Sequence, residues 1–209
     1  MDLNFLPDTE FSKLLQLERE INTLNTASVM KIDTGSMIGK RTLAATGGEE
    51  VDIPNAKRLV HLQFRRFAGC PFCSVHLRSI VERHDQIVAA GIREVVVFRS
   101  TAAALRRHHA DTPFAVIPDP KDKLYAEFGV GSGLRALFDP RVLLVAMSKI
   151  IRVLPKLPGI PPWGKGVLGL PADFLIATDG RVLACQYGTH ADDQWSVDEL
   201  LALARKHVS

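Results

Sequence analysis

Residues 59–73 read Leu59-Val60-His61-Leu62-Gln63-Phe64-Arg65-Arg66-Phe67-Ala68-Gly69-Cys70-Pro71-Phe72-Cys73. The apolar-rich first half of this stretch predicts a strand. Beyond Cys73 the apolar residues recur with helical spacing up to Gly91, which predicts one long amphipathic helix ending there. Its stripe consists of Leu77, Ile80, Val81, His84, Ile87 and Val88. A strand, a turn and a helix that opens with C-x-x-C are typical of a dithiol redox site.

The spacing of the two cysteines has a physical reason. Cys70 stands where the helix begins, and Pro71 occupies the first helical position, where a missing N–H costs nothing. The free N–H groups and the positive end of the helix dipole favour a thiolate at Cys70, and the thiolate is the nucleophile. Cys73 follows one turn later, within disulfide reach, and continues the apolar stripe. We therefore predict that Cys70 is the exposed attacker and Cys73 the shielded resolver.

The same stretch also contains charged residues and candidate metal ligands. Arg65 and Arg66 can add positive field, although alternation along a strand sends them to opposite faces. A C-x-x-C can also be half of a zinc site, but such a site needs two further ligands. The candidates His76, His84 and Cys185 do not form a second paired motif. Cys185 is better interpreted as a small core residue on a strand.

Composition narrows the class of protein. The chain has 209 residues, of which 46% are hydrophobic, and this is enough for one packed domain with additions. A net charge of +3 is too small to indicate nucleic-acid binding. The N-terminal residues lack the pattern of a signal peptide, and the longest clean apolar run, 142–147, is too short to span a membrane. Three cysteines, two in one motif, favour a cytoplasmic location.

Elements flank the motif on both sides. A helix after Asp8 is expected to open an N-terminal segment, 1–41, that continues as a connector, and the main domain is predicted to span 42–209. A hairpin is expected around Gly47-Gly48. Strands are predicted at 94–98 and 114–117, each followed by a short helix. The first of these helices ends in the pair His108-His109, which we interpret as a solvated face, since adjacent helical side chains point apart.

An insertion is predicted at about 130–166. Its apolar, basic-edged helical run, 134–154, can contact a membrane surface or a partner, but core packing or a dimer face is the better interpretation. A possible homodimer follows from that interpretation.

The C-terminal part supports a redox function independently. Gly169-Leu170-Pro171 precedes a strand at 174–177, Asp179-Gly180 forms a turn, and a second strand covers 181–187. Ser196 and Glu199 form a capping box for the last helix. Strand, hairpin and helix are also how a thioredoxin fold ends, and in that fold a cis-proline at the position of Pro171 lies against the C-x-x-C. A cis bond is allowed there, with an ordinary trans proline as the alternative.

The chain from about Gly47 onward resembles the peroxiredoxin-like branch of the alkyl hydroperoxide reductase/thiol-specific antioxidant superfamily. The resemblance rests on residues 64–73, on Asp119-Pro120 with 124–130, and on 169–176 with Asp179-Gly180. It implies an α/β, thioredoxin-like fold with a central mixed sheet flanked by helices, an N-terminal helical and hairpin extension, and a helical insertion before the last hairpin. It also implies that Cys70 occupies the peroxidatic position and that Cys73 replaces a more distant resolving cysteine.

The sequence departs from that family at the site. Peroxiredoxins usually carry P-x-x-x-T-x-x-C, but Phe67 and Gln63 stand where the Thr and Pro are expected, and Leu170-Pro171 replaces a later Arg. The groups that stabilise charge during O–O cleavage are therefore missing from their usual places.

We accordingly predict a thiol–disulfide oxidoreductase that needs no metal or organic cofactor. Its expected partners are a thiol reductant system and a disulfide or hydroperoxide substrate. Hydroperoxide reduction on the same cysteines is the first alternative, and a non-catalytic thioredoxin-fold binding module is the second. The predicted catalytic residues are Cys70 and Cys73, and the predicted supporting residues are Pro71, Phe72, Arg65, Arg66, Leu170 and Pro171.

Overall fold

The computed structural model describes residues 31–131 and 169–207, and the chain divides into two units, residues 1–31 and 32–209. All elements described below belong to the second unit. The predicted helix after Asp8 and the apolar run 134–154 lie outside the described residues. Residues of the predicted connector pair with the later hairpin, because Gly35 N–H donates to Val182 O and Ile38 N–H donates to Gly180 O.

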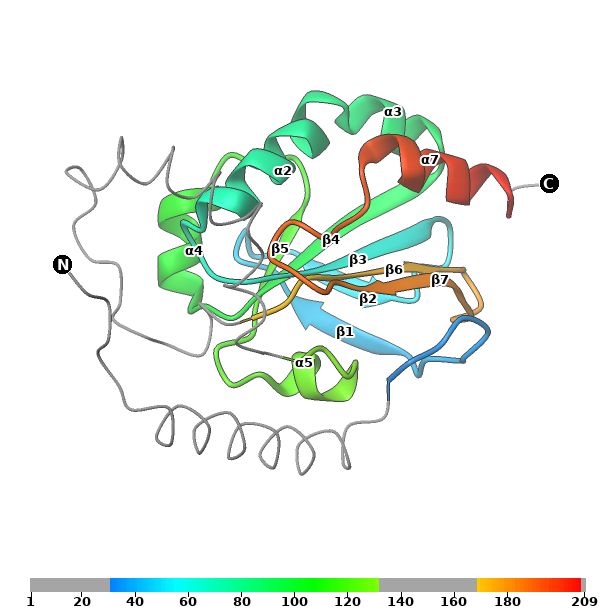
Figure 1. The fold of residues 1–209 in the computed structure, drawn as a ribbon, viewed down its shortest axis with the longest axis horizontal. Coiled ribbons are helices and arrows are strands. Elements are labelled where there is room, and N and C mark those ends of the chain that lie inside the picture. Colours follow the sequence, from blue (N-terminus) through cyan, green and yellow to red (C-terminus); the bar gives the residue numbers. More distant parts are fainter. Residues whose placement is uncertain (1–30, 132–168, 208–209) are drawn as a thin grey trace, which may run out of the picture. The chain divides into compact units, whose positions relative to one another are not determined.

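A five-stranded mixed sheet forms the centre of the fold, in the order β5-β4-β3-β6-β7 (Figure 1). The first three of these strands are parallel to one another, whereas β6 is antiparallel to β3 and β7 is antiparallel to β6. The central strand β3 comes directly before the cysteine motif, so the motif lies at the carboxyl end of the central strand. The strands are β3 (Leu59–Arg65), β4 (Ile92–Phe98), β5 (Ala115–Pro118), β6 (Ala172–Ile176) and β7 (Val182–Tyr187).

Helices connect or follow these strands, and one of them differs from the prediction. The expected single helix up to Gly91 is two helices, α2 and α3, separated at Arg83, whose φ of −114° is not helical. Val81 of the predicted apolar stripe is exposed, while Cys73, Leu77, Ile80 and Ile87 are buried. The helices are α2 (Pro71–Glu82), α3 (His84–Ala89), α4 (Ala102–His109), α5 (Lys123–Glu127) and α7 (Val197–Arg205).

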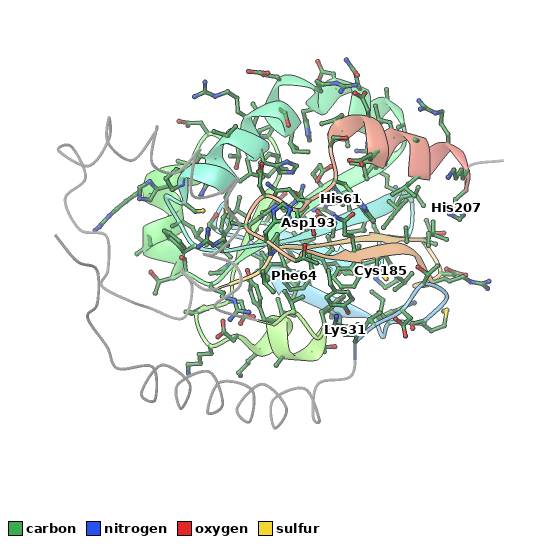
Figure 2. The ribbon with its side chains drawn as sticks, viewed as in Figure 1. Lys31, His61, Phe64, Cys185, Asp193 and His207 are labelled. Atoms are coloured by element: carbon green, nitrogen blue, oxygen red, sulfur yellow. The ribbon has the colours of Figure 1, made fainter. Side chains whose placement is uncertain are left out.

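The sheet separates two hydrophobic cores. The first lies under the hairpin β1 (Arg41–Ala44) and β2 (Glu50–Ile53) together with α5, and the second lies under α2, α3, α4 and α7. Figure 1 shows α2, α3 and α7 on one face of the sheet and α5 with β1 on the other. Strand β3 alternates accordingly: Figure 2 shows His61 on the side of α7 and Phe64 on the opposite side.

Tyr125 of α5 fixes the C-terminal end of β3 by hydrogen bonds. Tyr125 is buried, and its hydroxyl donates to the backbone oxygens of Arg65 and Val97, which joins the ends of β3 and β4. Asp119 orients α5 by accepting hydrogen bonds from the backbone N–H groups of Lys123, Leu124 and Tyr125. These contacts fix the backbone from which the cysteine motif departs.

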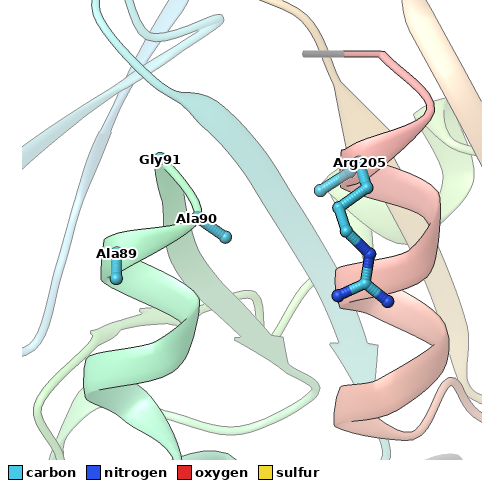
Figure 3. Close-up of a pocket in the computed structure, with 5 residues that line it drawn as sticks. Ala89, Ala90, Gly91 and Arg205 are labelled. Atoms are coloured by element: carbon cyan, nitrogen blue, oxygen red, sulfur yellow. The ribbon is translucent and has the colours of Figure 1, made fainter. Parts of the chain in front are cut away.

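A cavity of about 340 Å³ lies between the end of α3 and α7 (Figure 3). It is lined by Ala89, Ala90, Gly91, Ala204 and Arg205, so no residue of the cysteine motif contributes to it. Within residues 31–131 and 169–207, we find no helix with the length and apolar character needed to cross a membrane.

Candidate active site

Cys70 and Cys73 lie at the start of α2, as predicted. Cys70 is the N-cap, with extended backbone angles (φ −63°, ψ 118°), and Pro71 is the first helical residue. The first turn of α2 contains no acidic residue, so nothing there opposes a negative charge at the helix N-terminus. The three cysteines of the chain are thiols rather than disulfides.

Exposure does not distinguish the two cysteines of the motif. The prediction of an exposed Cys70 is wrong, because only 1% of its surface is accessible, compared with 2% for Cys73. The apolar side chains of the second core, including Leu77 and Phe98, surround the same region. Any division of labour between the two sulfurs must therefore come from electrostatics.

Several neighbouring groups shift the pKa of the Cys73 thiol. Its side chain is hydrogen-bonded to that of Cys70, and this bond, burial and the neighbouring Cys70 charge together raise the pKa of the Cys73 thiol well above its ordinary value. A hydrogen bond from the Arg66 backbone and the charge of Arg65 oppose this rise only in part. This direction favours the protonated form of the Cys73 thiol.

Arg65 is the centre of a buried polar cluster below α2. Its side chain is fully buried, and its guanidinium donates to Asp173 on β6 at 2.6 Å and 3.3 Å. The same group donates to the side-chain oxygen of Gln63 and, at 3.2 Å, to Nε2 of His76 on α2. Arg65 thus connects β3, β6 and the helix that carries both cysteines.

The cluster continues along β3 to His61. Nδ1 of His61 lies 2.9 Å from both carboxylate oxygens of Glu94, and Nε2 lies 3.1 Å from Asp173. Burial disfavours a charge on His61, but Glu94 and Asp173 outweigh burial and raise its pKa to about 9. Burial is likewise outweighed at Asp173, where Arg65 and His61 hold the pKa of the carboxyl well below its usual range. The cluster therefore contains two cations and two anions, all buried.

His76 is the member of this cluster contributed by α2. Burial, together with the charge of Arg65, lowers the pKa of His76 to about 3, so its imidazole is neutral and accepts the hydrogen bond from Arg65. Located three residues after Cys73, it attaches the first turns of α2 to the charged layer beneath them.

Leu170 and Pro171, two of the predicted supporting residues, precede β6. Among the described residues the cis peptide bond is Ile53–Pro54, so of the two isomers left open for the Leu170–Pro171 bond the structure contains trans. Leu170 and Pro171 lie at the end of the sheet: Leu170 N–H donates to Gly131 O, and Pro171 O accepts from Gly188 N–H.

The other predicted supporting residues are Arg65, Arg66 and Phe72. Arg65 and Arg66 are both buried, and the Arg66 guanidinium lies 5.8 Å from the centre of the Phe67 ring. Phe72 is the second residue of α2.

The pair His108-His109 is only half solvated. Both imidazoles belong to the last turn of α4, but His109 is buried and stacks on Phe98 at a centroid distance of 4.7 Å. Burial, with a contribution from His108, lowers the pKa of His109. His108 is exposed, and its ring lies against Gly69, the residue before Cys70.

The sequence contains one signal for the buried cluster, in the pattern of β3. His61, Gln63 and Arg65 alternate with apolar residues on a central strand, so three of the four side chains on one face of β3 are polar and must be satisfied from neighbouring elements. The partners Glu94, Asp173 and His76 are distant in sequence and carry no such signal.

In the part of the chain that the structure describes, no group of three or more His, Cys, Asp or Glu residues has the arrangement of a metal site.

Comparison with known proteins supports the architecture. The family model described as AhpC/TSA antioxidant enzyme matches residues 78–190, more than half of the chain, beginning five residues after Cys73. No curated protein matches the chain by sequence.

Solved structures extend the similarity to most of the chain. Peroxidoxin BcpB from Mycobacterium tuberculosis is 18% identical with a TM-score of 0.61, covering 85% of this chain and 99% of its own. A peroxiredoxin-like protein from Aquifex aeolicus is 12% identical with a TM-score of 0.58, at 87% and 91% coverage. Xanthomonas campestris peroxiredoxin Q is 14% identical with a TM-score of 0.58, at 87% and 99% coverage. At these identities the similarity establishes the predicted thioredoxin-like α/β fold.

Proposed function

Because the chain belongs to the AhpC/TSA antioxidant enzyme family and is thereby a peroxiredoxin-like thiol oxidoreductase, we propose that Cys70 and Cys73 form its redox-active pair, acting on disulfides. Cys70 is the attacking sulfur and Cys73 the resolving one. Pro71 and Phe72 complete the motif between them. The matched part of the chain begins after the motif, so the argument for these residues rests on their geometry.

The proposed reaction has three steps. The Cys70 thiolate attacks one sulfur of a substrate disulfide, forms a mixed disulfide and expels the other sulfur as a thiolate that takes up a proton. Cys73 then loses its proton, attacks the Cys70 sulfur and releases the second substrate thiol, leaving a Cys70–Cys73 disulfide. An external dithiol reduces this disulfide and is itself oxidised, which restores the starting state.

The observation that carries the proposal is the asymmetry of the pair. Cys70 occupies the N-cap of α2, where the helix dipole favours a thiolate, whereas the hydrogen bond to Cys70 and burial raise the pKa of the Cys73 thiol. The hydrogen bond between the two side chains keeps the resolving sulfur next to the attacking one. Arg65, fixed by Asp173, adds positive charge beneath both.

Trapping experiments test the assignment. The Cys73→Ser variant should accumulate a mixed disulfide with bis(2-hydroxyethyl) disulfide, detected by intact mass spectrometry as one added substrate half on Cys70. The Cys70→Ser variant should form none, and Cys185→Ser serves as the matched control with unchanged turnover. A mixed disulfide on Cys73 in the Cys70→Ser variant, formed at the wild-type rate, would reverse the assignment.

Hydroperoxide reduction is the second candidate, and the family match favours it. In that case the Cys70 thiolate attacks a peroxide oxygen and becomes a sulfenic acid, which Cys73 condenses to the disulfide with loss of water. Stopped-flow mixing of the reduced protein with hydrogen peroxide, beside its reaction with the disulfide, decides between the substrates. Peroxide oxidation much faster than disulfide exchange, and abolished by Cys70→Ser, would establish the peroxidase.

The physiological setting belongs to the same proposal. A thiol reductant system is the proposed electron donor. The cysteine usage supports a cytoplasmic location, and the apolar run 134–154 supports a homodimer. A structure described as a putative thiol:disulfide interchange protein DsbE from Chlorobium tepidum, 20% identical with a TM-score of 0.50, shares the fold.

A further inference from the structure

The exposed imidazole of His108 packs on the loop that carries Cys70. A Cβ atom built on Gly69 would lie 3.1 Å from Cε1, 3.3 Å from Nε2 and 3.5 Å from Nδ1 of His108, so the Cε1 edge of the ring is in close contact with this glycine. Cys70 is the next residue, one Cα–Cα step of about 3.8 Å further along. His108 is therefore a titratable side chain adjacent to the proposed nucleophile, and the steps described above give it no role.

Gly69 is the residue type that this arrangement requires. Its φ of +77° is in the left-handed region, and the absence of a side chain leaves the space that the His108 ring occupies. The neighbouring His109 is held by stacking on Phe98, which fixes the turn of α4 from which His108 projects. The position of His108 is thus determined from both sides, by the loop and by its own helix.

The proposed chemistry needs a proton at this location. Attack by Cys70 breaks an S–S bond, and the departing sulfur carries the electron pair as a thiolate; a basic thiolate leaves slowly unless it is protonated. The buried cations are engaged elsewhere: Arg65 is bonded to Asp173 and Gln63, and His61 is enclosed by Glu94 and Asp173. Histidine is the side chain best suited to donate a proton near neutral pH.

We propose that His108 is the general acid that protonates the leaving group when Cys70 attacks its substrate. In balanced form, the Cys70 thiolate, a disulfide and the His108 imidazolium give a Cys70 mixed disulfide, a free thiol and neutral His108. In this step the departing sulfur is reduced to a thiol, the Cys70 sulfur is oxidised and the transferred half stays at the disulfide level; the two-electron reduction of the substrate is complete when Cys73 releases the second thiol. The inference rests on the proposed role of Cys70.

Two uncharged disulfides test this role, because they differ in the basicity of the leaving thiolate. With bis(2-hydroxyethyl) disulfide the leaving thiolate is basic, and we expect His108→Gln to slow mixed-disulfide formation about 100-fold. With 4,4′-dithiodipyridine the leaving thiolate is stabilised by its ring and needs no acid, so the rate should change by less than about 3-fold. Arg107→Gln, which removes an exposed positive charge from the same turn, should leave both rates within about 3-fold.

A chemical rescue separates proton donation from a purely structural role. Added imidazole should restore the reaction of His108→Ala with bis(2-hydroxyethyl) disulfide in a concentration-dependent way. Equal slowing with both disulfides, unchanged rates with both, or no rescue by imidazole would overturn the proposal. If Cys70→Ser instead reacts like the wild type, the failure lies in the proposed function and not in the assignment of His108.

Discussion

At the scale of single residues, Gly69 combines a backbone constraint with a packing constraint. Placing an L-residue at its positive φ costs about 1–2 kcal/mol, and a methyl group would also displace the His108 ring. We expect Gly69→Ala to lower the free energy of unfolding by about that amount and to slow the reaction with bis(2-hydroxyethyl) disulfide. Urea denaturation and stopped-flow kinetics measure the two effects.

The chain offers a matched control for this variant. Gly48 has a similar φ of +89° in the β1–β2 turn, with open space where a Cβ would stand. Gly48→Ala should therefore cost a comparable stability and leave the kinetics unchanged. If both variants reacted at the wild-type rate, the contact between residue 69 and His108 would have no kinetic importance.

Arg65 gives the second prediction at this scale. Replacing it by Met leaves the buried carboxylate of Asp173 without its closest cation, and removing one partner of a buried pair costs about 3–5 kcal/mol. The exposed pair of Arg181 and Asp179, 3.7 Å apart, is the control, since Arg181→Met should cost less than about 1 kcal/mol. Equal losses in urea denaturation would mean that the buried cluster contributes no more than a surface ion pair.

Residue-level inference from sequence succeeded where the cause was local. The N-cap position of Cys70 and the place of Pro71 follow from helix-terminus chemistry within four residues, and both are confirmed. The burial of Cys70 depends on side chains from other elements, so the spacing of the motif could not predict it. For the same reason Asp173, Glu94 and His76 were missed as partners of β3.

At the scale of elements, α7 illustrates a terminus that sequence alone defines. Ser196 accepts from Glu199 N–H, and the Glu199 carboxylate accepts from Ser196 N–H, so the predicted capping box is confirmed. Ser196→Ala should destabilise the protein by about 1 kcal/mol in urea denaturation. Ser74→Ala, a comparable change inside α2, should be neutral within about 0.5 kcal/mol, because alanine is the better helix former. A neutral Ser196→Ala would show that α7 is held by packing alone.

The helix that follows the motif shows where element-level prediction ends. Apolar periodicity continues past Arg83 and predicted an uninterrupted helix, but the backbone leaves the helical region there. Arg83 donates to Gln86 in the next helix and to Asp198 at the start of α7, so the break is supported by tertiary contacts. Such contacts join distant parts of the chain and leave no trace in local spacing.

At the scale of the whole molecule, the buried cluster links stability to pH. The pKa of His76 falls from 6.5 in a model compound to about 3, so the unfolded chain takes up a proton below pH 6.5 that the native state does not. Stability must therefore decrease as the pH falls from about 6.5 towards 3. His61 has the opposite sign: its pKa is raised to about 9, so its contribution is complete below pH 6.5 and is lost as the pH rises through about 9.

Unfolding free energies of the wild type and of His76→Gln, measured in urea between pH 7 and pH 4.5, test the acidic part of this profile. The variant should lose less stability on acidification, with a difference in slope approaching about 1.4 kcal/mol per pH unit. Parallel profiles would indicate that His76 is protonated in the native protein. His190→Gln, which removes a histidine outside the cluster, provides the matched control.

The architecture as a whole followed well from the sequence. Alternating strands and helices, the hairpin around Gly47-Gly48 and the C-terminal strand-turn-strand predicted the α/β sheet that the structure contains. The trans Leu170–Pro171 bond was not predictable in the same way, because both isomers satisfy the local sequence. The boundary between an N-terminal segment and a main domain at residues 41–42 stays a prediction.

The near-complete burial of both cysteines predicts a kinetic gate for the proposed chemistry. With 1% and 2% of their surfaces accessible, a bulky disulfide reaches the sulfurs only in a minor, open conformation, so its observed rate is the intrinsic rate multiplied by the open fraction. The observed rate then depends on local opening of the polypeptide as much as on the acidity of the thiol. Urea below the unfolding transition should accelerate the reaction with 4,4′-dithiodipyridine, and an oxidant as small as hydrogen peroxide should be less affected. The protein would thus select oxidants by size through the extent of its local opening.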